Sequence, residues 1–412
     1  VTGVQTCALP ILQEIIETTE KYGNGHVCFA DNILPGEWFT ELVPKLKEYR
    51  ETKGKDAGWA NGEVPDIDFH FTAEVKANLR REQVLALKEA GYSILQPGME
   101  SLSDHVLKLL DKGVTGIQNV ALMKYAREAD LIVLWNILTG TVGETIEDYR
   151  LQADLFPLIE HLQPPSNFYD IIYMRNSVYF NEQQKYGLRL IPDPVFRYLS
   201  PEDENYVRDI AFHFVDENKK DDPFLVLERI RLKNVWEAWK GSWAPGKIRP
   251  RLSMAEENGA LLLTDTRSVS KKRNICLTGP ERSVYLAASS PSSKKTLLEK
   301  AQSFDAARSG EAAEGIIQSL VERGLLLSLS GRYLALAVPV TLEKAREESY
   351  REFLARLSAD AALRMSLKED GPFEGNAELL SSVGRSHGYM FDESTVRTAD
   401  LIPGRNEMDL LD

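Results

Sequence analysis

A regular alternation of helix-like and strand-like segments between residues 12 and 175 constrains the fold most strongly. The predicted helices cover 12–22, 36–49, 81–90, 104–110, 117–129 and 146–161, and the predicted strands cover 26–31, 67–78, 92–96, 131–138 and 168–175. Strands that recur about every 25 to 40 residues with a helix between them are typical of βαβ units, which build a parallel sheet. The sequence therefore predicts an α/β protein with either a barrel or a doubly wound sheet.

The strand predicted at 67–78 favours the barrel. Its polar side chains alternate strictly with apolar ones, so one face is polar or ionisable; the polar row is Asp66, Asp68, His70, Thr72, Glu74 and Lys76. A doubly wound sheet would bury this row beneath helices, whereas a barrel has a lumen and keeps its chemistry at the carboxyl ends of its strands. An edge strand with a solvated face is the alternative interpretation.

Composition narrows the function. The chain has 412 residues, 43% of them hydrophobic, and a net charge of −13, which argues against a nucleic-acid backbone binder. It has no apolar run of the roughly 18 residues that a membrane span needs. Its three cysteines, Cys7, Cys28 and Cys276, are too few and too scattered for a disulfide framework, which fits a reducing cytoplasm. We expect Cys28 and Cys276 to act as small core hydrophobes.

The first eleven residues differ in character from the rest. They carry no initiating Met, no basic segment and no long apolar stretch, so they do not form a signal peptide. They closely resemble the conceptual translation of a sequencing adapter. We therefore expect that residues 1–11 are not natural protein sequence, that the natural gene began further upstream, and that the chain is a fragment.

Six short motifs in order along residues 29–214 carry a family resemblance. They are Phe29-Ala30-Asp31-Asn32-Ile33-Leu34-Pro35, Glu74-Val75-Lys76-Ala77-Asn78-Leu79, Gln96-Pro97-Gly98-Met99-Glu100-Ser101, Trp135-Asn136-Ile137-Leu138, His161-Leu162-Gln163-Pro164-Pro165 and Ala211-Phe212-His213-Phe214. Together they resemble the radical S-adenosylmethionine (SAM) maturases of ribosomally made peptides, a family of radical C-methyltransferases. The resemblance implies a partial (β/α) TIM-type barrel, with SAM, a 4Fe-4S cluster and cobalamin as cofactors.

The resemblance also implies site residues. Asp31 and Asn32 match the place that reaches the methionyl amino group, and Glu100 matches the acidic residue at the ribose hydroxyls. Further cofactor-binding candidates are Gln96, Asn136, Leu138, Gly140 and Glu144, and the catalytic candidates are Glu74, Lys76, Arg175 and Tyr179. The chain departs from the family pattern at 140–144 and 175–180, although Gly140, Glu144, Arg175 and Tyr179 persist.

One requirement of the family is missing. Three cysteines at CxxxCxxC spacing must hold three irons of the cluster, and no such triplet occurs here. We therefore assign no metal ligands and expect the chain to be inactive alone, with the cluster loop and any cobalamin domain upstream. One alternative is a cluster-free barrel scaffold or a peptide-binding interaction protein. Another is a metal-dependent barrel lyase that uses Asp68, His70 and Glu74.

Three further regions follow the predicted barrel at 12–235. Residues 236–258 are expected to form a connector whose Trp236, Trp239 and Trp243 dock on the barrel. Residues 259–340 look like a winged helix, for which we favour peptide recognition over a structural role and over nucleic-acid binding. The helical tail at 341–412 resembles the leader domain of nitrile-hydratase-type precursors, with a C-terminal helical hairpin as the alternative. The expected partners are a precursor peptide, bound through its leader, and a reductant protein that the sequence does not identify.

Overall fold

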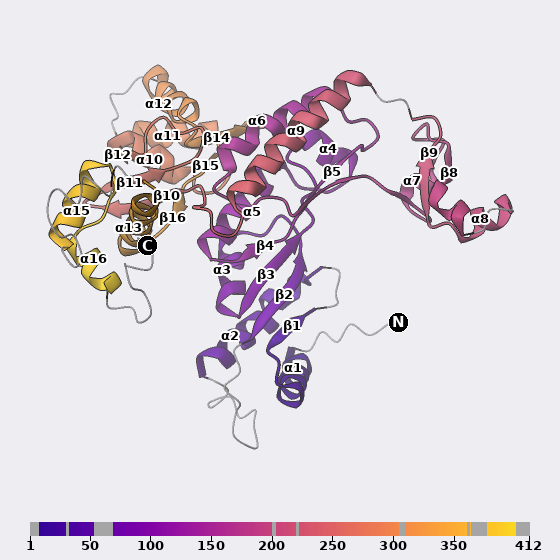
Figure 1. The fold of residues 1–412 in the computed structure, drawn as a ribbon, viewed down its shortest axis with the longest axis horizontal. Helices are drawn as coiled ribbons and strands as arrows, with labels where there is room; N and C mark the ends of the chain where they lie inside the picture. Colours follow the sequence, from indigo (N-terminus) through magenta and orange to yellow (C-terminus); the bar gives the residue numbers. More distant parts are fainter. Residues whose placement is uncertain are drawn as a thin grey trace.

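The structure, a computed structural model, describes residues 8–29, 33–52, 69–199, 203–219, 222–304, 310–360, 363 and 377–400. Asp31, Asn32, Asp66 and Asp68 lie outside the described residues, and so does Cys7. The chain is a mixed α/β protein with parallel sheets. A small lobe projects from one side of the central α/β unit, and the C-terminal units lie on the other side (Figure 1).

The central unit is built on parallel strands. Strands β1 (His26–Cys28), β2 (His70–Val75), β3 (Tyr92–Pro97) and β4 (Ile132–Val133) pair in this order, and all neighbours are parallel. Strand β5 (Asn136–Thr139) pairs in parallel with β6 (Asn167–Asp170), and a parallel bridge joins Glu100 to Ile137. This bridge links the two-stranded β5–β6 sheet to the segment that follows β3.

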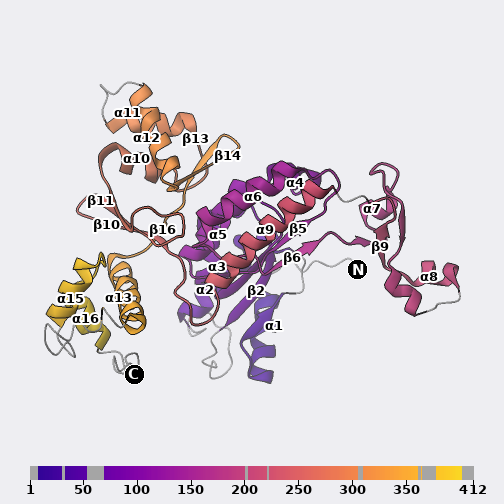
Figure 2. The same cartoon turned by 45° about the horizontal axis from the view of Figure 1, so that its top comes forward.

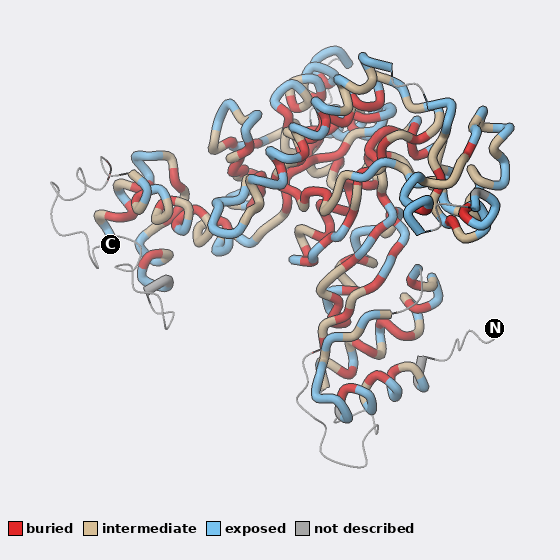
Figure 3. Tube along the Cα trace, turned by 45° about the vertical axis from the view of Figure 1, so that its right-hand side comes forward, coloured by how far each residue is buried: buried red, intermediate tan, exposed pale blue. Residues whose placement is uncertain are grey.

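Helices cover the apolar face of these strands. They are α1 (Ala8–Tyr22), η1 (Gly36–Phe39), α2 (Leu42–Thr52), α3 (Arg81–Glu89), α4 (Asp104–Leu109), α5 (Gly116–Glu128), α6 (Ile146–Ile159) and α9 (Pro223–Ser242). Figure 2 shows α3, α5, α6 and α9 in front of the strands. Phe71, Leu95 and Ile137 of the sheet are fully buried beneath this layer. Figure 3 shows the buried residues concentrated in this part of the molecule.

Three predicted elements are divided in the structure. The helix expected at 36–49 becomes η1 and α2, separated at Thr40 and Glu41. The strand expected at 131–138 becomes β4, which pairs with β3, and β5, which pairs with β6. The strand expected at 168–175 becomes β6 and β7 (Tyr173–Met174), because β7 leaves the parallel sheet for an antiparallel one. Periodicity alone does not reveal such a change of partner.

The projecting lobe has its own small core. Strand β7 pairs with β9 (His213–Asp216), which pairs with β8 (Leu190–Pro192), and α7 (Val178–Asn181), η2 (Pro194–Tyr198) and α8 (Glu204–Ile210) complete the lobe. Its buried side chains are Leu190, Phe196, Val207, Ala211 and Phe214. This cluster is separate from the core of the central unit, so the lobe packs as a unit of its own.

Two sheets follow α9. Strands β12 (Asn274–Leu277), β11 (Ala260–Asp265), β10 (Leu252–Glu257) and β16 (Val338–Pro339) form one sheet in that order. Helices α10 (Gly279–Ala287), α11 (Lys294–Phe304) and α12 (Gly310–Glu322) accompany a second sheet of β13 (Ser292–Ser293), β15 (Arg332–Ala335) and β14 (Leu326–Leu329). Helix α9 runs through the 235/236 boundary expected from the sequence, and β10 pairs with β11 across the 258/259 boundary.

The expected connector begins in the last turns of α9, continues through an irregular segment at 243–251 and ends in β10. Trp236, Trp239 and Trp243 lie on or next to α9, and their indole N–H groups donate to the carbonyls of Pro165, Leu162 and Glu160. The tail consists of α13 (Leu342–Ala359), α15 (Ala377–Ser386) and α16 (Glu393–Asp400). In the described part of the chain, no helix has the length and apolar character needed to cross a membrane.

Candidate functional site

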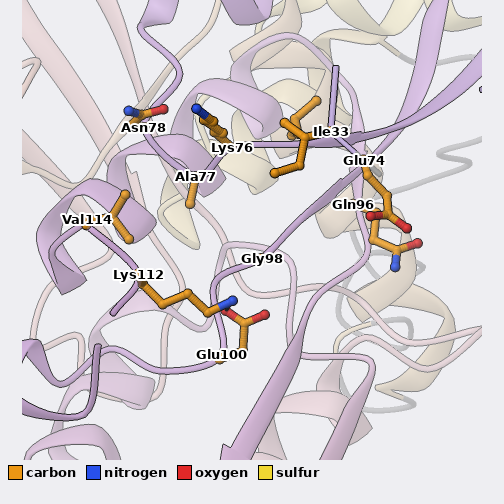
Figure 4. A pocket seen from close by; sticks show the side chains of 12 residues that line it. Ile33, Glu74, Lys76, Ala77, Asn78, Gln96, Gly98, Glu100, Lys112 and Val114 are labelled. Atoms are coloured by element: carbon orange, nitrogen blue, oxygen red, sulfur yellow. Dashed lines mark ion pairs between the residues drawn. The ribbon is translucent and has the colours of Figure 1, made fainter. Parts of the chain in front are cut away.

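A cleft lies at the carboxyl ends of β2 and β3 on the polar side of the sheet (Figure 4). Its volume is about 530 Å³. The lining residues come from the loop after β1, from the ends of β2 and β3, and from the loop after α4: Ile33, Glu74, Val75, Lys76, Ala77, Asn78, Gln96, Gly98, Glu100, Lys112, Gly113 and Val114. The cleft thus joins four of the predicted site residues, Glu74, Lys76, Gln96 and Glu100.

Strand β2 places its polar side chains on the cleft side. Phe71, Ala73 and Val75 are buried against the helices, whereas Glu74 and Lys76 are exposed. The alternation predicted from the sequence is therefore present over the described part of this strand. Strand β2 pairs with β1 on one side and with β3 on the other, so the edge-strand interpretation is wrong.

Glu100 is the central acidic group of the cleft. It has a positive φ of 54°, which is uncommon for a residue with a side chain and is typical of sites where the surrounding structure fixes the backbone. The Lys112 ammonium lies 2.8 Å from Glu100 Oε2, and both side chains remain partly accessible. This contact is an ion pair without hydrogen-bond geometry, and Glu100 Oε2 is buried with no hydrogen-bond partner.

Gly98 permits this arrangement. A Cβ atom at position 98 would lie 3.3 Å from Glu100 Oε1 and 3.4 Å from Lys112 Nζ. At these short distances, a Cβ atom would force the side chains of the ion pair to move by a few tenths of an ångström. Gly98 therefore leaves room above β3 for the Glu100–Lys112 ion pair.

The residues predicted on β5 lie beside Glu100. The backbone N–H of Leu138 donates to the Glu100 carbonyl at 2.9 Å. The Asn136 side chain accepts a hydrogen bond from Asn167 Nδ2 at 3.0 Å, so it is engaged within the sheet. Leu138 and Asn136 thus border the site without being among the residues that line the cleft.

Gly140 and Glu144 form a second polar cluster after β5. The Gly140 N–H donates to Glu144 Oε2 at 2.8 Å, and the Tyr149 hydroxyl also donates to this oxygen. Burial raises the pKa of Glu144, although the hydrogen bond from Tyr149 offsets part of that rise. Burial also raises the pKa of Tyr149, and the neighbouring Glu144 carboxylate raises it further. Glu144 closes the loop after β5, where its role is to hold Gly140.

The two catalytic candidates in the lobe are not in the cleft. Arg175 Nε donates to the carbonyl of Ala211 at 2.8 Å, and the guanidinium lies over the rings of Phe180 and Phe214. It therefore fastens the strands of the lobe. Tyr179 packs edge-on against Tyr173 and Tyr186, and burial raises its pKa. Tyr179 is near enough to Glu144 for this carboxylate to contribute to the shift.

The structure corrects the expectation for the cysteines. Cys28 and Cys276 are both exposed rather than buried in the core. Cys28 shares the polar side of the sheet with His26, two residues earlier on β1, and Cys276 lies on the edge strand β12. Among the described residues, no group of three His, Cys, Asp or Glu could hold a metal ion. His70 and Glu74 thus form no such group with a described residue, and Asp68 lies outside the description.

Sequence reasoning assigned no role to Lys112 or to the hydrogen bonds around Asp148. Lys112 follows α4 and reaches the cleft because the chain turns back after this helix, which no local pattern reveals. The Asp148 carboxylate is hydrogen-bonded to His105 Nδ1 at 2.8 Å and accepts another hydrogen bond from the Ser103 hydroxyl. Although burial alone would raise the pKa of Asp148, these hydrogen bonds lower it overall. The capping signal at Thr145 could have indicated that Asp148 is engaged.

Comparisons with known proteins place the chain near methyltransferases. No protein-family model matches it. Over 83 residues it is 32% identical to an uncharacterized methyltransferase, PH0819, from Pyrococcus horikoshii; the match covers 20% of this chain and 18% of that protein.

The structural neighbours include cobalamin-dependent radical SAM enzymes. The methyltransferase TsrM from Kitasatospora setae is 16% identical with a TM-score of 0.33, and the match covers 40% of this chain and 30% of TsrM. The enzyme OxsB, in its structure with aqua-cobalamin and SAM, is 11% identical with a TM-score of 0.37, and the match covers 98% of this chain and 52% of OxsB. The chain spans about half or less of the length of each of these proteins.

Proposed function

We propose that the chain is part of a radical SAM enzyme that C-methylates a ribosomally made peptide, and that the cleft at Glu100 holds the adenosyl part of SAM. When bound, SAM supplies the radical chemistry that the family resemblance implies. The motif resemblance and the short match to a curated methyltransferase support this proposal. The single observation that carries it is Glu100, which lines the cleft and has a buried carboxylate oxygen without a hydrogen-bond partner.

The chemistry of the cleft suits an adenosyl ligand. A carboxylate can accept hydrogen bonds from two adjacent ribose hydroxyls. Glu100 lines the cleft next to Gly98, where the missing side chain leaves space beside the carboxylate. Glu74, one strand away, can face the ammonium of the methionyl part. In this proposal the ion pair with Lys112 orients Glu100 until a ligand competes for it.

We assign no site for the other two cofactors to the described residues. A 4Fe-4S cluster needs three thiolates, and the described residues offer two cysteines on different sheets. We assign no described residue to cobalamin either. In this proposal both groups belong to parts of the enzyme outside the given sequence, and the chain alone is inactive.

The substrate partner in this proposal is a precursor peptide. The region of α10–α12 with its small sheet has the element order of a winged helix, and β14 is an edge strand that can accept a peptide strand. Residues 251–340 carry 12 basic and 9 acidic residues, a small excess that gives little support to nucleic-acid binding. A cluster-free scaffold is the second candidate function, and the absence of a cysteine triplet favours it.

Equilibrium binding of SAM to the full chain tests the proposal. We expect saturable binding that Glu100→Gln weakens at least tenfold, because a charge-assisted hydrogen bond contributes about 1.5–3 kcal/mol. Glu89→Gln is the matched control, since Glu89 pairs with Lys47 on the surface of α3. If wild type and Glu100→Gln bind SAM equally well, or neither binds, the cleft is not an adenosyl site and the scaffold function is favoured.

A further inference from the structure

The helical tail is a separable unit docked on the C-terminal sheet. Its apolar core comprises Tyr350, Phe353, Leu357, Leu363, Ala377, Leu380, Tyr389, Phe391 and Val396. This cluster is not continuous with the large core that runs through the central unit and α10–α12. The tail lies beside β10 and β11 in two views (Figures 1 and 2). Its attachment beyond residue 341 therefore depends on the contacts at this interface, and these are largely polar.

A two-arginine clamp holds α13 to the sheet. Glu352 of α13 lies between Arg251, which precedes β10, and Arg273, which precedes β12. Arg251 Nε is 3.0 Å from Glu352 Oε1, and the Arg273 guanidinium contacts Glu352 Oε2. Arg251 Nη1 also lies 2.9 Å from Glu348, one turn earlier on the same helix. The Arg251 and Glu352 side chains are only 9% and 12% exposed, so the clamp is shielded from solvent.

The same surface contacts the turn between α15 and α16. Asn274 Nδ2 donates to the Gly388 carbonyl at 2.7 Å, and Gly388 has a positive φ of 80°. The Arg273 guanidinium lies 4.3 Å from the centre of the Tyr389 ring, which is a cation–π contact. We call Arg251, Arg273 and Asn274 the arginine face. This face contacts an acidic helix and a Gly-Tyr turn at the same time.

Charge supports an acidic ligand for this face. Residues 341–412 carry 15 acidic and 9 basic residues, whereas residues 251–340 carry 12 basic and 9 acidic residues. Arg346 of α13 pairs in the opposite sense with Glu257 of β10 at 3.0 Å. This reversed pair fixes the direction in which α13 lies across the sheet. The face therefore selects both the charge and the orientation of a helical segment.

We propose that the arginine face is a binding surface for acidic helical peptides that end in a Gly-aromatic turn, and that the tail is its intramolecular occupant. Tethering gives the tail a high effective concentration at the face, so a free peptide of the same chemistry binds only when the clamp is weakened. The inference goes beyond the proposed function, because it requires neither SAM nor the cleft at Glu100.

The test uses the full chain and a fluorescein-labelled synthetic peptide of residues 341–400. Glu352→Arg in the full chain places a cation against two arginines, so we expect the tail to leave the face and the labelled peptide to bind in its place. Glu347→Arg is the matched control, because Glu347 lies on the same helix but pairs only with Arg351 near the surface, among the described contacts. Fluorescence anisotropy measures binding, and hydrogen exchange of α13 reports whether the tail has left.

We expect the Glu352→Arg chain to bind the peptide at least tenfold more tightly than either the wild type or Glu347→Arg. Adding Arg273→Glu to the Glu352→Arg chain should weaken this binding at least tenfold, because the face then repels Glu352 of the peptide. The proposal is overturned if the tail of Glu352→Arg stays protected, if its face binds no more peptide than the wild type, or if Arg273→Glu leaves peptide binding unchanged. We expect all of these variants to bind SAM as the wild type does. Failure of this proposal can therefore be told apart from failure of the proposed function.

Discussion

Lys124 makes the stability of the protein depend on pH in a calculable way. This side chain of α5 is 1% exposed, and its ammonium donates to the carbonyl of Ala335 at 2.7 Å and of Ser289 at 3.2 Å. Burial lowers the pKa of Lys124 from 10.5 to about 7, although the nearby Glu128 carboxylate offsets part of the shift. Between these two values the unfolded chain binds more protons than the folded chain, so the free energy of unfolding rises with pH.

The expected gain follows from the two pKa values. Between pH 7 and pH 9 the contribution of Lys124 to the free energy of unfolding should increase by about 2 kcal/mol. Other buried groups contribute little in this window. Burial lowers the pKa of His161 below its usual range, so His161 acts at lower pH, and burial raises the pKa of Tyr285, so Tyr285 acts at higher pH.

Urea denaturation at pH 7, 8 and 9 measures this gain in the wild type and in Lys124→Met. The methionine variant removes the titrating group, so its free energy of unfolding should change by about 2 kcal/mol less over the same range. It should also be less stable than the wild type at pH 9, because the carbonyls of Ala335 and Ser289 lose their donor. Equal pH slopes in the two proteins would refute the reasoning, since Lys124 would then titrate alike in the folded and unfolded chains.

Three further predictions concern packing and the site. Gly384→Ala should destabilise the tail by about 1–3 kcal/mol, seen as faster hydrogen exchange in α15, because a Cβ there meets the Phe391 ring; Gly315→Ala, whose Cβ would meet nothing within 4 Å, should instead stabilise α12 by about 1 kcal/mol. Trp239→Phe should lower the free energy of unfolding by about 1–3 kcal/mol in urea titrations, because the Leu162 carbonyl loses a donor at 3.1 Å; an unchanged midpoint would mean that water replaces the indole. Arg175→Lys should leave SAM binding unchanged while loosening the lobe, and a tenfold loss of SAM affinity would return Arg175 to the list of site residues.

The sequence indicated the elements of the central sheet better than their partners. Alternation along β2 predicted correctly which side of the strand is polar, because period-two patterning records burial directly. It could not show that β7 joins an antiparallel sheet, since two residues pair equally well with either kind of neighbour. Nor could it show that Arg175, which follows β6 closely in the sequence, contacts carbonyls of the lobe.

In the cleft, too, some features could be predicted from the sequence and others could not. Glu74, Lys76, Gln96 and Glu100 were predictable because parallel strands bring their carboxyl ends to one edge of a sheet. Lys112 was not predictable, because its approach to Glu100 depends on how the chain returns after α4. The exposed positions of Cys28 and Cys276 were missed because a cysteine is apolar enough for either environment, and only the strand partners decide which face it occupies.

The three indole hydrogen bonds of α9 determine where the molecule can bend. Trp236, Trp239 and Trp243 are spaced by three and four residues, so all three point toward the segment after α6 and bond to successive carbonyls there. Sliding α9 along its axis or rotating it would break all three bonds together. A swing of the lobe therefore cannot be passed into α9. On the β6 side such a swing would have to be taken up at Ile171 and Ile172, the two residues between β6 and β7.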